Sequence, residues 1–258
     1  MTTGLEQTLL TAADVKQFHD QGYLGPFTLC SPEEMAAIRA QIDRDVLTTD
    51  GPDQRKDRNE RQQSRHLDCR VIWELCSHPA IVERMAQIYG PDLVLWRSHM
   101  FLKEPGGKRV PWHQDLSYWP IEPAINITAW VAVDETTVAN GCLDVIPGSH
   151  KACRTHIPVP ADMRPTTSFA TMADPNSFDV KEAVQLCMQP GQFVLFNEKT
   201  LHHSEINRSN TRRLGLAVRV TVPIVRVNHD ELFPGHRNLM LRGEDRMGFN
   251  RIGQPPVR

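Results

Sequence analysis

Residues 127–151 read ITAWVAVDETTVANGCLDVIPGSHK. Two short apolar runs lie in and just before this stretch, at 125–134 and 142–146. An Asn-Gly pair at 140–141 precedes the second run, and a Pro-Gly pair at 147–148 follows it. Such pairs are typical of tight turns, and short apolar runs rich in β-branched residues between turns are typical of strands. The stretch therefore predicts two strands of a double-sheet roll or barrel.

The pattern continues on both sides of this stretch. Further short apolar or alternating runs lie at 94–102, 192–196 and 214–225. Before residue 90 the spacing of apolar residues is helical instead, and Ser31, Pro32 and Glu34 form a strong helix start. The predicted helices cover 12–21, 32–47 and 79–89. We expect one domain over 1–258, with N-terminal helices over 12–90, a β core over about 92–225 and a C-terminal tail over 226–258.

Residues 50–66 differ from their surroundings. They contain no large aliphatic or aromatic residue. A segment without such side chains has nothing to anchor it to a core. We therefore expect a solvated loop or a mobile lid here, and the tail is a second candidate for closing over a site.

The composition excludes several classes of protein. The chain has 258 residues, is 40% hydrophobic and carries a formal net charge of −2. A dedicated nucleic-acid or anionic-membrane binder is usually basic, and no apolar stretch approaches the roughly 20 residues of a membrane helix. The N-terminus has no secretory signal, and the six cysteines show no CxxC spacing, so we expect reduced thiols and a cytoplasmic location. The expected partner is a small-molecule substrate, with no nucleic acid and no membrane, and the expected state is a monomer or a homodimer.

The sequence Trp-His-Gln-Asp at 112–115 carries the strongest local chemical signal. Side chains two apart on a strand face the same way, so His113 and Asp115 can converge on one point. They make up two thirds of a 2-His-1-carboxylate facial triad, the ligand set of non-haem Fe(II) oxygenases. The third ligand is expected on a later strand, where His202 and His203 are adjacent. Only one of these two can face the metal.

Arg213 and Ser204 favour His202 as that ligand. His202 and Ser204 share a strand face, whereas His203 faces away and is expected to be a structural histidine. Arg213 lies eleven residues after His202, at the start of an apolar strand. An arginine can grip a carboxylate through two parallel N–H groups, and a nearby hydroxyl adds one hydrogen bond. Arg213 and Ser204 could thus hold the far end of a dicarboxylate such as 2-oxoglutarate, with Arg212 and Arg219 as the alternatives to Arg213.

Three segments together resemble the phytanoyl-CoA dioxygenase family of Fe(II)/2-oxoglutarate oxygenases. They are WHQDLSYWP (112–120), the stretch 127–151 and LHHSEINRSNTRRLGLAVRV (201–220). The resemblance covers roughly residues 12–225. It implies a mainly β protein with flanking helices around a double-stranded β-helix, a cupin-like jelly roll. It also implies Fe(II), 2-oxoglutarate and O₂ as reactants, ascorbate as a stimulant, and release of succinate and CO₂. By position, Met100 and Trp130 match family residues that contact 2-oxoglutarate, although a plain core role stays open for both.

The substrate is less defined by the sequence. Related halogenases lack the carboxylate ligand, so Asp115 indicates hydroxylation. Five residues are candidate substrate contacts, because they lie on or near the strand of the metal ligands or at the end of the last strand: Lys108, Tyr118, Trp119, Asn126 and Arg226. For each of them, packing in the core or solvation at the surface is the alternative role. The cluster of Lys108, Arg109 and Asn126 favours a small polar or anionic substrate. The segments also resemble bacterial members that act on 2-aminoethylphosphonate-type compounds. The alternative is an acyl-CoA or natural-product intermediate.

Two other functional classes could use the same residues. A zinc-dependent hydrolase would need a general base near the open metal position, and it gives no reason for the placement of Arg213 and Ser204. A jelly-roll module that only binds ligands would be expected to have lost a metal ligand, and none is missing here.

Overall fold

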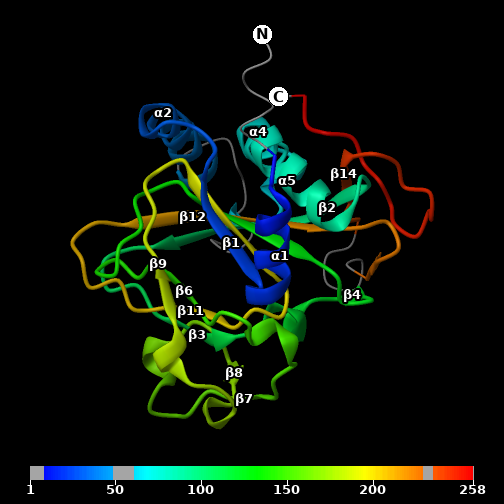
Figure 1. Ribbon diagram of the computed structural model, residues 1–258. Coiled ribbons are helices and arrows are strands. Elements are labelled where there is room, and N and C mark those ends of the chain that lie inside the picture. Colours follow the sequence, from blue (N-terminus) through cyan, green and yellow to red (C-terminus); the bar gives the residue numbers. More distant parts are fainter. Residues whose placement is uncertain (1–8, 49–60, 229–234, 258) are drawn as a thin grey trace.

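Two antiparallel sheets face each other in the computed structural model, which describes residues 9–48, 61–228 and 235–257 (Figure 1). Neighbours in the larger sheet are β1 (Tyr23–Thr28), β10 (Gln192–Asn197), β5 (Ile127–Ala132), β12 (Arg213–Thr221), β2 (Leu93–Lys103) and β14 (Leu239–Arg242), in that order. Those in the smaller sheet are β3 (Val110–His113), β11 (His202–Ser204), β6 (Leu143–Val145) and β9 (Val184–Leu186). Two short pairs complete the strands: β4 (Ile121–Glu122) with β13 (Arg226–Val227), and β7 (His156–Pro158) with β8 (Thr171–Ala173). The predicted jelly-roll class is confirmed.

The N-terminal helices form where the capping residues predict them. The helix α1 spans Ala12–Gln21, and α2 spans Pro32–Ile42 and continues as a π-helical turn over Asp43–Leu47. The side chains of Thr11 and Ser31 each accept a hydrogen bond at the start of these helices in a full capping box. The helix α5 spans Pro79–Tyr89 as predicted, whereas α4 (Arg70–Cys76) has too few turns to show a clear helical period in the sequence.

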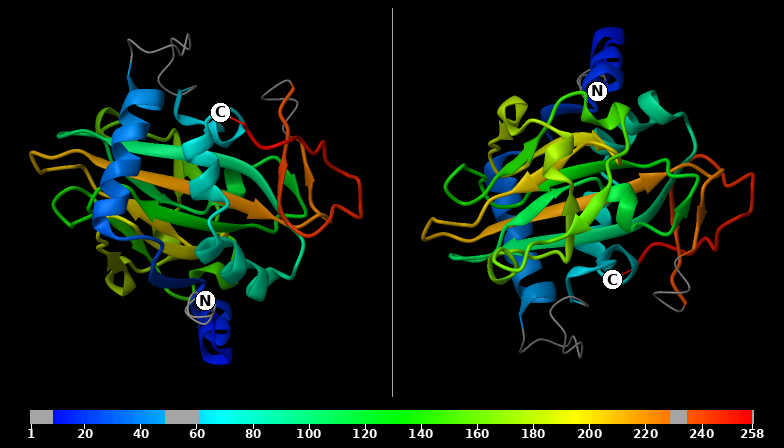
Figure 2. Two further views of the ribbon diagram at one scale, coloured as in Figure 1. Left: turned by 90° about the horizontal axis from the view of Figure 1, so that it is seen from above. Right: turned by 90° about the horizontal axis from the view of Figure 1, so that it is seen from below.

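The helices α2, α4 and α5 cover the outer face of the larger sheet (Figure 2). Alternate side chains of β12 point into this layer and are fully buried, namely Leu214, Leu216, Val218 and Val220. They pack against helix residues such as Met35, Ile72 and Met85. Burial of each of these side chains stabilises the fold by about 1.5–3 kcal/mol. The other alternate residues of β12 face the smaller sheet, and this inner face carries the site.

Strands from outside the predicted β core complete the larger sheet. The strand β1 comes from the helical region and pairs with β10, and β14 comes from the tail and pairs with β2. Neither strand shows a regular alternation of apolar residues, and both lie at a sheet edge, where long-range pairing rather than local sequence sets the structure. The division of the chain into helices, core and tail is therefore less sharp than the sequence suggests.

The expectation of a solvated segment at 50–66 is wrong for its last part. Residues 50–60 lie outside the described part of the chain. Within 61–66, the side chains of Gln62, Arg65 and His66 are buried. The backbone N–H of Ser64 donates to the Ser98 carbonyl at 2.7 Å, and His66 Nδ1 lies 2.8 Å from the Ser98 hydroxyl. Hydrogen bonds to β2 anchor this stretch without any large apolar side chain.

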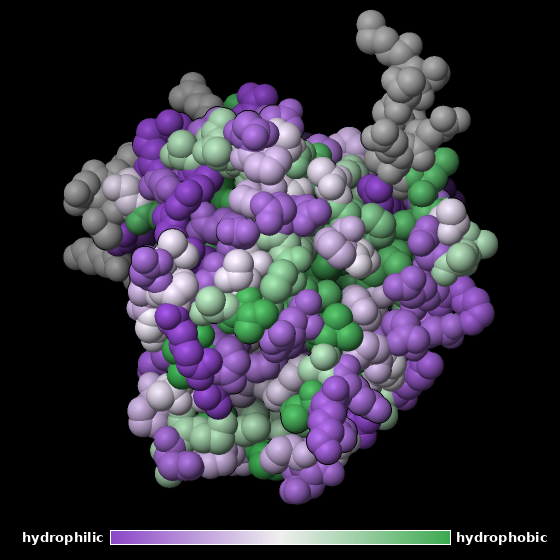
Figure 3. Space-filling model, turned by 60° about the vertical axis from the view of Figure 1, so that its left-hand side comes forward, coloured by the Kyte–Doolittle hydropathy of each residue, from purple (hydrophilic) through white to green (hydrophobic). Residues whose placement is uncertain are grey.

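Surface features agree with a packed multilayer structure. In the described part of the chain, no helix has both the length and the apolar character needed to cross a membrane. On the face shown in Figure 3, apolar residues form small groups separated by polar ones. The extended apolar contacts thus lie between the layers, on both sides of the larger sheet.

Candidate active site

Three side chains converge between the two sheets. His113 ends β3, and His202 begins the neighbouring β11, where the two residues are direct partners in the register. Asp115 Oδ1 lies 3.7 Å from His113 Nε2, and Asp115 Oδ2 lies 3.9 Å from His202 Nε2. One ligand atom from each residue falls within 4.8 Å of the other two, and all three residues are buried. Two imidazoles and a carboxylate on one triangular face suit non-haem Fe(II).

Backbone carbonyls orient both histidines. The Nδ1–H of His113 can donate to the Pro111 carbonyl at 2.8 Å, and that of His202 to the Thr200 carbonyl at 2.9 Å. Such a bond fixes the tautomer in which Nε2 carries the lone pair. Both Nε2 atoms are therefore prepared to bind a metal.

Asp115 reaches the site in a different way from the one predicted. It begins the 3-10 helix η4 (Asp115–Tyr118) and does not continue β3. The reason is Gln114, whose buried side chain donates to the carbonyls of Ala152 and Lys199 and accepts from the backbone of Arg154. These bonds hold the chain at a turn directly after the strand, and the turn brings the carboxylate back to His113.

The charge of the Asp115 carboxylate is favoured inside the protein. Burial acts to raise its pKa, but Arg219 and the neighbouring histidines outweigh this effect and lower the pKa to about 2. The Arg219 guanidinium lies 3.9 Å from Asp115 Oδ1. The carboxylate is thus ionised at neutral pH, as a metal ligand must be.

His203 points away from the triad, as the strand alternation predicts. Its Nε2 lies 3.0 Å from Asp144 Oδ2, and its ring packs on Trp112 with the centroids 4.2 Å apart. The side chain of His203 therefore serves the packing of the smaller sheet.

A cavity of about 460 Å³, which includes some open solvent, adjoins the triad. Beside the three ligands, its lining includes four residues that the sequence predicted, Arg213, Ser204, Trp130 and Arg219. It also includes His203 and residues that the sequence did not single out, among them Phe101, Thr128, Phe169 and Phe196.

Arg213 occupies the end of this cavity formed by the start of β12. Its guanidinium is buried and lies 5.2 Å from the centre of the Trp130 ring. Arg213 Nε has no hydrogen-bond partner among the described residues. Burial lowers the pKa of Arg213 to about 10. A carboxylate at this position would supply both the missing acceptor and the missing negative charge.

Ser204 and Lys103 complete the same end of the cavity. The Lys103 ammonium donates to the Ser204 hydroxyl at 2.8 Å, which leaves the hydroxyl proton free to bond an anion. Lys103 faces Arg213 in the strand register. Burial, followed by the charge of Arg213, lowers the pKa of Lys103 to about 7. The hydrogen-bond donors at this end of the cavity fit the carboxylate of 2-oxoglutarate that lies far from the metal. The ligand atoms of the triad fit the metal itself, which the other end of 2-oxoglutarate would chelate.

Of the alternatives to Arg213, Arg212 lies outside the cavity. It forms ion pairs with Asp43 at 2.7 Å and with Asp134 at 3.2 Å. Arg219 lies at the opposite end, beside Asp115. Arg213 is therefore the arginine that shares a cavity end with Ser204.

The two residues assigned to 2-oxoglutarate by position have different surroundings. Trp130 lines the cavity next to Arg213. Met100 is fully buried in the layer between the larger sheet and the helices, and its neighbour Phe101 lines the cavity instead. The alternation of β2 places Met100 on the outer face, so the structure does not bring it to the site.

None of the five predicted substrate residues is among the residues that line the cavity, and three of them have surroundings of another kind. Lys108 is exposed in the turn before β3, and Arg226 is exposed on β13 and packs on Phe249. Asn126 is fully buried, accepts a hydrogen bond from Trp96 Nε1 at 2.7 Å and donates to Thr128. These environments favour the solvation and packing roles that the sequence left open.

The two aromatic candidates lie closer to the triad. The ring of Tyr118 packs edge-on against His113, with centroids 5.8 Å apart, and its hydroxyl bonds to Thr171. Trp119 packs against Trp96, and the Arg219 guanidinium lies 4.9 Å from its ring centre. Tyr118 and Trp119 thus contact two residues that line the cavity, His113 and Arg219, but do not line it themselves.

The sequence did not single out Gly215 or Lys103. A side chain at Gly215 would place its Cβ 2.0 Å from the Trp130 ring, so only glycine lets this ring lie beside Arg213. The signal available in the sequence was strand alternation, because Arg213, Gly215, Ala217 and Arg219 fall on one face. The partner Lys103 requires knowledge of which strands pair.

Comparison with known proteins gives a consistent family assignment. A family model described as phytanoyl-CoA dioxygenase (PhyH) matches residues 18–215. A probable phytanoyl-CoA dioxygenase of Caenorhabditis elegans is 33% identical over 156 residues, 57% of this chain and 49% of that protein. The chain spans about half the length of the first curated relatives that it matches.

Two further similarities cover nearly the whole chain. A probable alpha-ketoglutarate-dependent hypophosphite dioxygenase of Stutzerimonas stutzeri is 25% identical over 268 residues, 95% of this chain and 91% of that protein. The solved structure of CytC3 with Fe(II) and alpha-ketoglutarate has a TM-score of 0.73 at 27% identity and covers 95% of this chain and 93% of CytC3.

Proposed function

The chain belongs to the phytanoyl-CoA dioxygenase family of Fe(II)/2-oxoglutarate oxygenases, and from this premise we propose that it hydroxylates a small polar or anionic organic substrate. The reaction would convert 2-oxoglutarate and O₂ to succinate and CO₂. One observation carries the proposal. The buried triad of His113, Asp115 and His202 shares a cavity with Arg213, whose buried Nε has no partner among the described residues.

The residues of the chain have separate roles in this reaction. His113, Asp115 and His202 would hold Fe(II), which when bound supplies the redox chemistry of O₂ activation. Arg213 and Ser204 would bind the far carboxylate of 2-oxoglutarate, and Trp130 would wall its carbon chain. Phe101, Phe169 and Phe196 line the same cavity and limit the access of water to it.

The shared cavity and one relative support a small substrate. The cavity beside the triad must take both 2-oxoglutarate and the substrate. The Stutzerimonas relative is named for hypophosphite, a small oxyanion. A 2-aminoethylphosphonate-type compound is the specific substrate that we propose first, and an acyl-CoA or natural-product intermediate is the alternative. The cytoplasmic location and the monomeric or homodimeric state stay predictions.

The test is succinate formation by the purified protein with Fe(II), ascorbate and 2-oxoglutarate. We expect slow turnover without substrate and faster turnover with 2-aminoethylphosphonate. The matched variants are two adjacent arginines: Arg213→Gln should lose turnover at low 2-oxoglutarate, whereas Arg212→Gln should keep it. Hydrolytic activity that needs Zn(II) and ignores 2-oxoglutarate would contradict the proposal. Stimulation by an acyl-CoA instead of the phosphonate would keep the reaction class and replace the substrate.

A further inference from the structure

Two cysteines lie opposite each other at one end of the ladder between β6 and β9. These strands pair antiparallel through Leu143 with Leu186, Asp144 with Gln185 and Val145 with Val184. The same register, continued by one residue, places Cys142 opposite Cys187. Directly opposite residues of an antiparallel pair have Cα atoms about 4.5 or 5.5 Å apart, and their side chains leave the sheet on the same face. A disulfide needs a Cα separation of about 4.4–6.8 Å, so this register suits one.

The thiols of the pair also interact with each other. Both cysteines are free in the structure. Burial, followed by the charges of Asp144 and Cys187, raises the pKa of Cys142, and a hydrogen bond with the Cys187 thiol contributes to the same shift. Cys142 Sγ lies 3.5 Å from Asp144 Oδ1 on the same face of the strand. Two sulfur atoms that share a hydrogen bond need only small side-chain rotations to come within bonding distance.

The two cysteines differ in their access to solvent. Cys187 is exposed, whereas Cys142 is 2% exposed. An oxidant in solution therefore reaches Cys187 first, and Cys142 lies behind it. An accessible thiol beside a second thiol that can resolve its oxidised form is the usual arrangement of redox-sensitive cysteines. The two residues are far apart in the sequence, so only the strand pairing reveals them as a pair.

The pair stands at both ends of a segment that adjoins the active site. Residues 146–183 connect β6 to β9 and contain β7, β8 and Phe169. Phe169 lines the cavity, and its ring packs edge-on against His113 with centroids 4.9 Å apart. The ladder that joins the ends of this segment consists of three residue pairs, and β9 lies at the edge of the smaller sheet. A covalent bond between Cys142 and Cys187 would fasten these ends to each other.

We propose that Cys142 and Cys187 form a reversible disulfide when the protein meets a peroxide, and that this bond stabilises the segment between them. In the first step the Cys187 sulfur attacks one oxygen of hydrogen peroxide. The S–O bond forms, the O–O bond breaks, and the departing oxygen leaves as water with the thiol proton. In the second step the Cys142 sulfur attacks the Cys187 sulfur, and the hydroxyl leaves as water with the Cys142 proton. The two thiols lose two electrons, and one peroxide becomes two waters.

The disulfide would leave the machinery of the proposed reaction in place. Neither cysteine is among the residues that line the cavity. Cys142 does lie near the cosubstrate end, because a negative charge on its sulfur would raise the pKa of Lys103 and of Arg213. A neutral thiol and a disulfide both carry no charge, so oxidation does not change the electrostatics of this end. We therefore expect the oxidised protein to bind 2-oxoglutarate as the reduced protein does.

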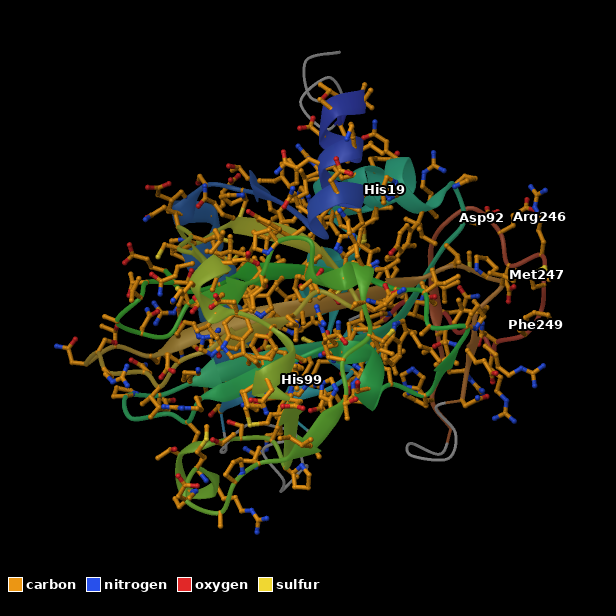
Figure 4. All side chains as sticks on the ribbon, turned by 60° about the horizontal axis from the view of Figure 1, so that its bottom comes forward. His19, Asp92, His99, Arg246, Met247 and Phe249 are labelled. Carbon is orange, nitrogen blue, oxygen red and sulfur yellow. The ribbon has the colours of Figure 1, made fainter. Side chains whose placement is uncertain are left out.

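The first experiment identifies the bond. The full-length protein is loaded with Mn(II), so that no iron reacts with the oxidant, and is treated with equimolar hydrogen peroxide. The remaining thiols are alkylated before peptide mass spectrometry. We expect a cross-linked peptide that joins Cys142 to Cys187 and disappears with dithiothreitol. Met247 is exposed on the tail at the right of Figure 4, and its sulfoxide measures non-specific oxidation.

Matched variants test the assignment of the two thiols. Cys187→Ser changes an exposed residue and should abolish the cross-link while Cys142 stays reduced. Cys153→Ser changes another exposed cysteine and should form the cross-link as the wild type does. No disulfide in the wild type, a disulfide from Cys187 to Cys153, or one that joins two molecules would each overturn the proposal.

The second experiment measures the effect on stability. A bond from residue 142 to residue 187 restrains the unfolded chain, so the Tm of the oxidised wild type should exceed that of the reduced form by roughly 5–10 °C. Amide exchange in β9 should slow in parallel. Peroxide-treated Cys187→Ser should show neither change. An oxidised wild type that carries the disulfide but melts no higher, or that loses 2-oxoglutarate affinity, would overturn the stabilising role. The mass and the Tm need no turnover, so failure of the proposed function would leave this test unaffected.

Discussion

The two faces of β12 differ in almost every physical respect although they belong to one strand. The outer face carries Leu214, Leu216, Val218 and Val220, which pack under the helices. The inner face carries Arg213, Gly215, Ala217 and Arg219, all of which line the cavity or lie against its wall. The outer face gains free energy from burial, whereas the inner face buries charges at a cost. Burial of the outer face therefore stabilises the fold, and part of this free energy offsets the cost of keeping charged side chains buried in the site.

The largest expected effect comes from removing a metal ligand on the inner side. His113→Ala, Asp115→Ala and His202→Ala should each lose bound iron and reduce 2-oxoglutarate turnover to background, because three ligands are needed for binding and geometry. Iron quantitation and succinate assays check this. His203→Ala, whose side chain contacts Asp144 and Trp112, should keep bound iron and most of the activity. An active His202→Ala beside an inactive His203→Ala would reverse the ligand assignment.

The outer face should respond in the opposite way. Leu216→Ala leaves a cavity in the main core and should lower the free energy of unfolding by about 3 kcal/mol. Its apparent KM for 2-oxoglutarate should remain at the wild-type value below the unfolding transition, since the side chain faces away from the site. Urea unfolding and steady-state kinetics measure the two quantities. A change in KM as large as that of an inner-face variant would show that the two faces are coupled.

Arg213→Lys tests the geometry of the inner face at constant charge. The ammonium lacks the two parallel N–H groups of the guanidinium, so 2-oxoglutarate affinity should fall by about 2 kcal/mol, or roughly 30-fold. Ser204→Ala should cost about 1 kcal/mol, because one neutral donor is lost. The measurement is the apparent KM for 2-oxoglutarate at saturating Fe(II), with iron content as the control. Unchanged KM in Arg213→Lys would mean that Lys103 or Arg219 holds the cosubstrate.

A further expected effect concerns the pH dependence of stability. The pKa of Lys103 is lowered to about 7 by burial and by Arg213, against the opposing influence of Glu205, Asp144 and Cys142. Between pH 7 and about 10.4, the usual pKa of lysine, the unfolded chain binds a proton that the folded chain does not. Stability should therefore rise with pH in this window and stay level below pH 7, as far as Lys103 contributes.

Lys103→Met removes this contribution and is the matched variant. Thermal unfolding of both proteins from pH 6 to pH 9.5 gives the comparison, and the wild-type Tm should rise relative to that of the variant. Parallel curves would show that Lys103 keeps its proton in the folded protein. Addition of 2-oxoglutarate should reduce the difference, because its carboxylate favours the charged ammonium.

Local patterns in the sequence predicted much of this molecule. Thr11 and Ser31 fix two helix starts through capping boxes, which need only residues three apart. His202 and Ser204 share a face because strand side chains alternate, and the same rule turns His203 away. The side chains that can bind a metal are likewise recognised in the sequence by their residue type. These features depend on contacts over a few residues, so the sequence alone determines them.

Other features depend on which distant segments pair, and no local pattern contains that information. The register places His113 opposite His202 and Arg97 opposite Arg219. The pairing of β2 turns Met100 toward the helices and Phe101 toward the cavity. A shift of one residue in a strand would reverse each of these orientations. The sequence therefore determined the chemical groups of the site, and only the tertiary structure decided which of them meet, because long-range register sets the face on which each side chain lies.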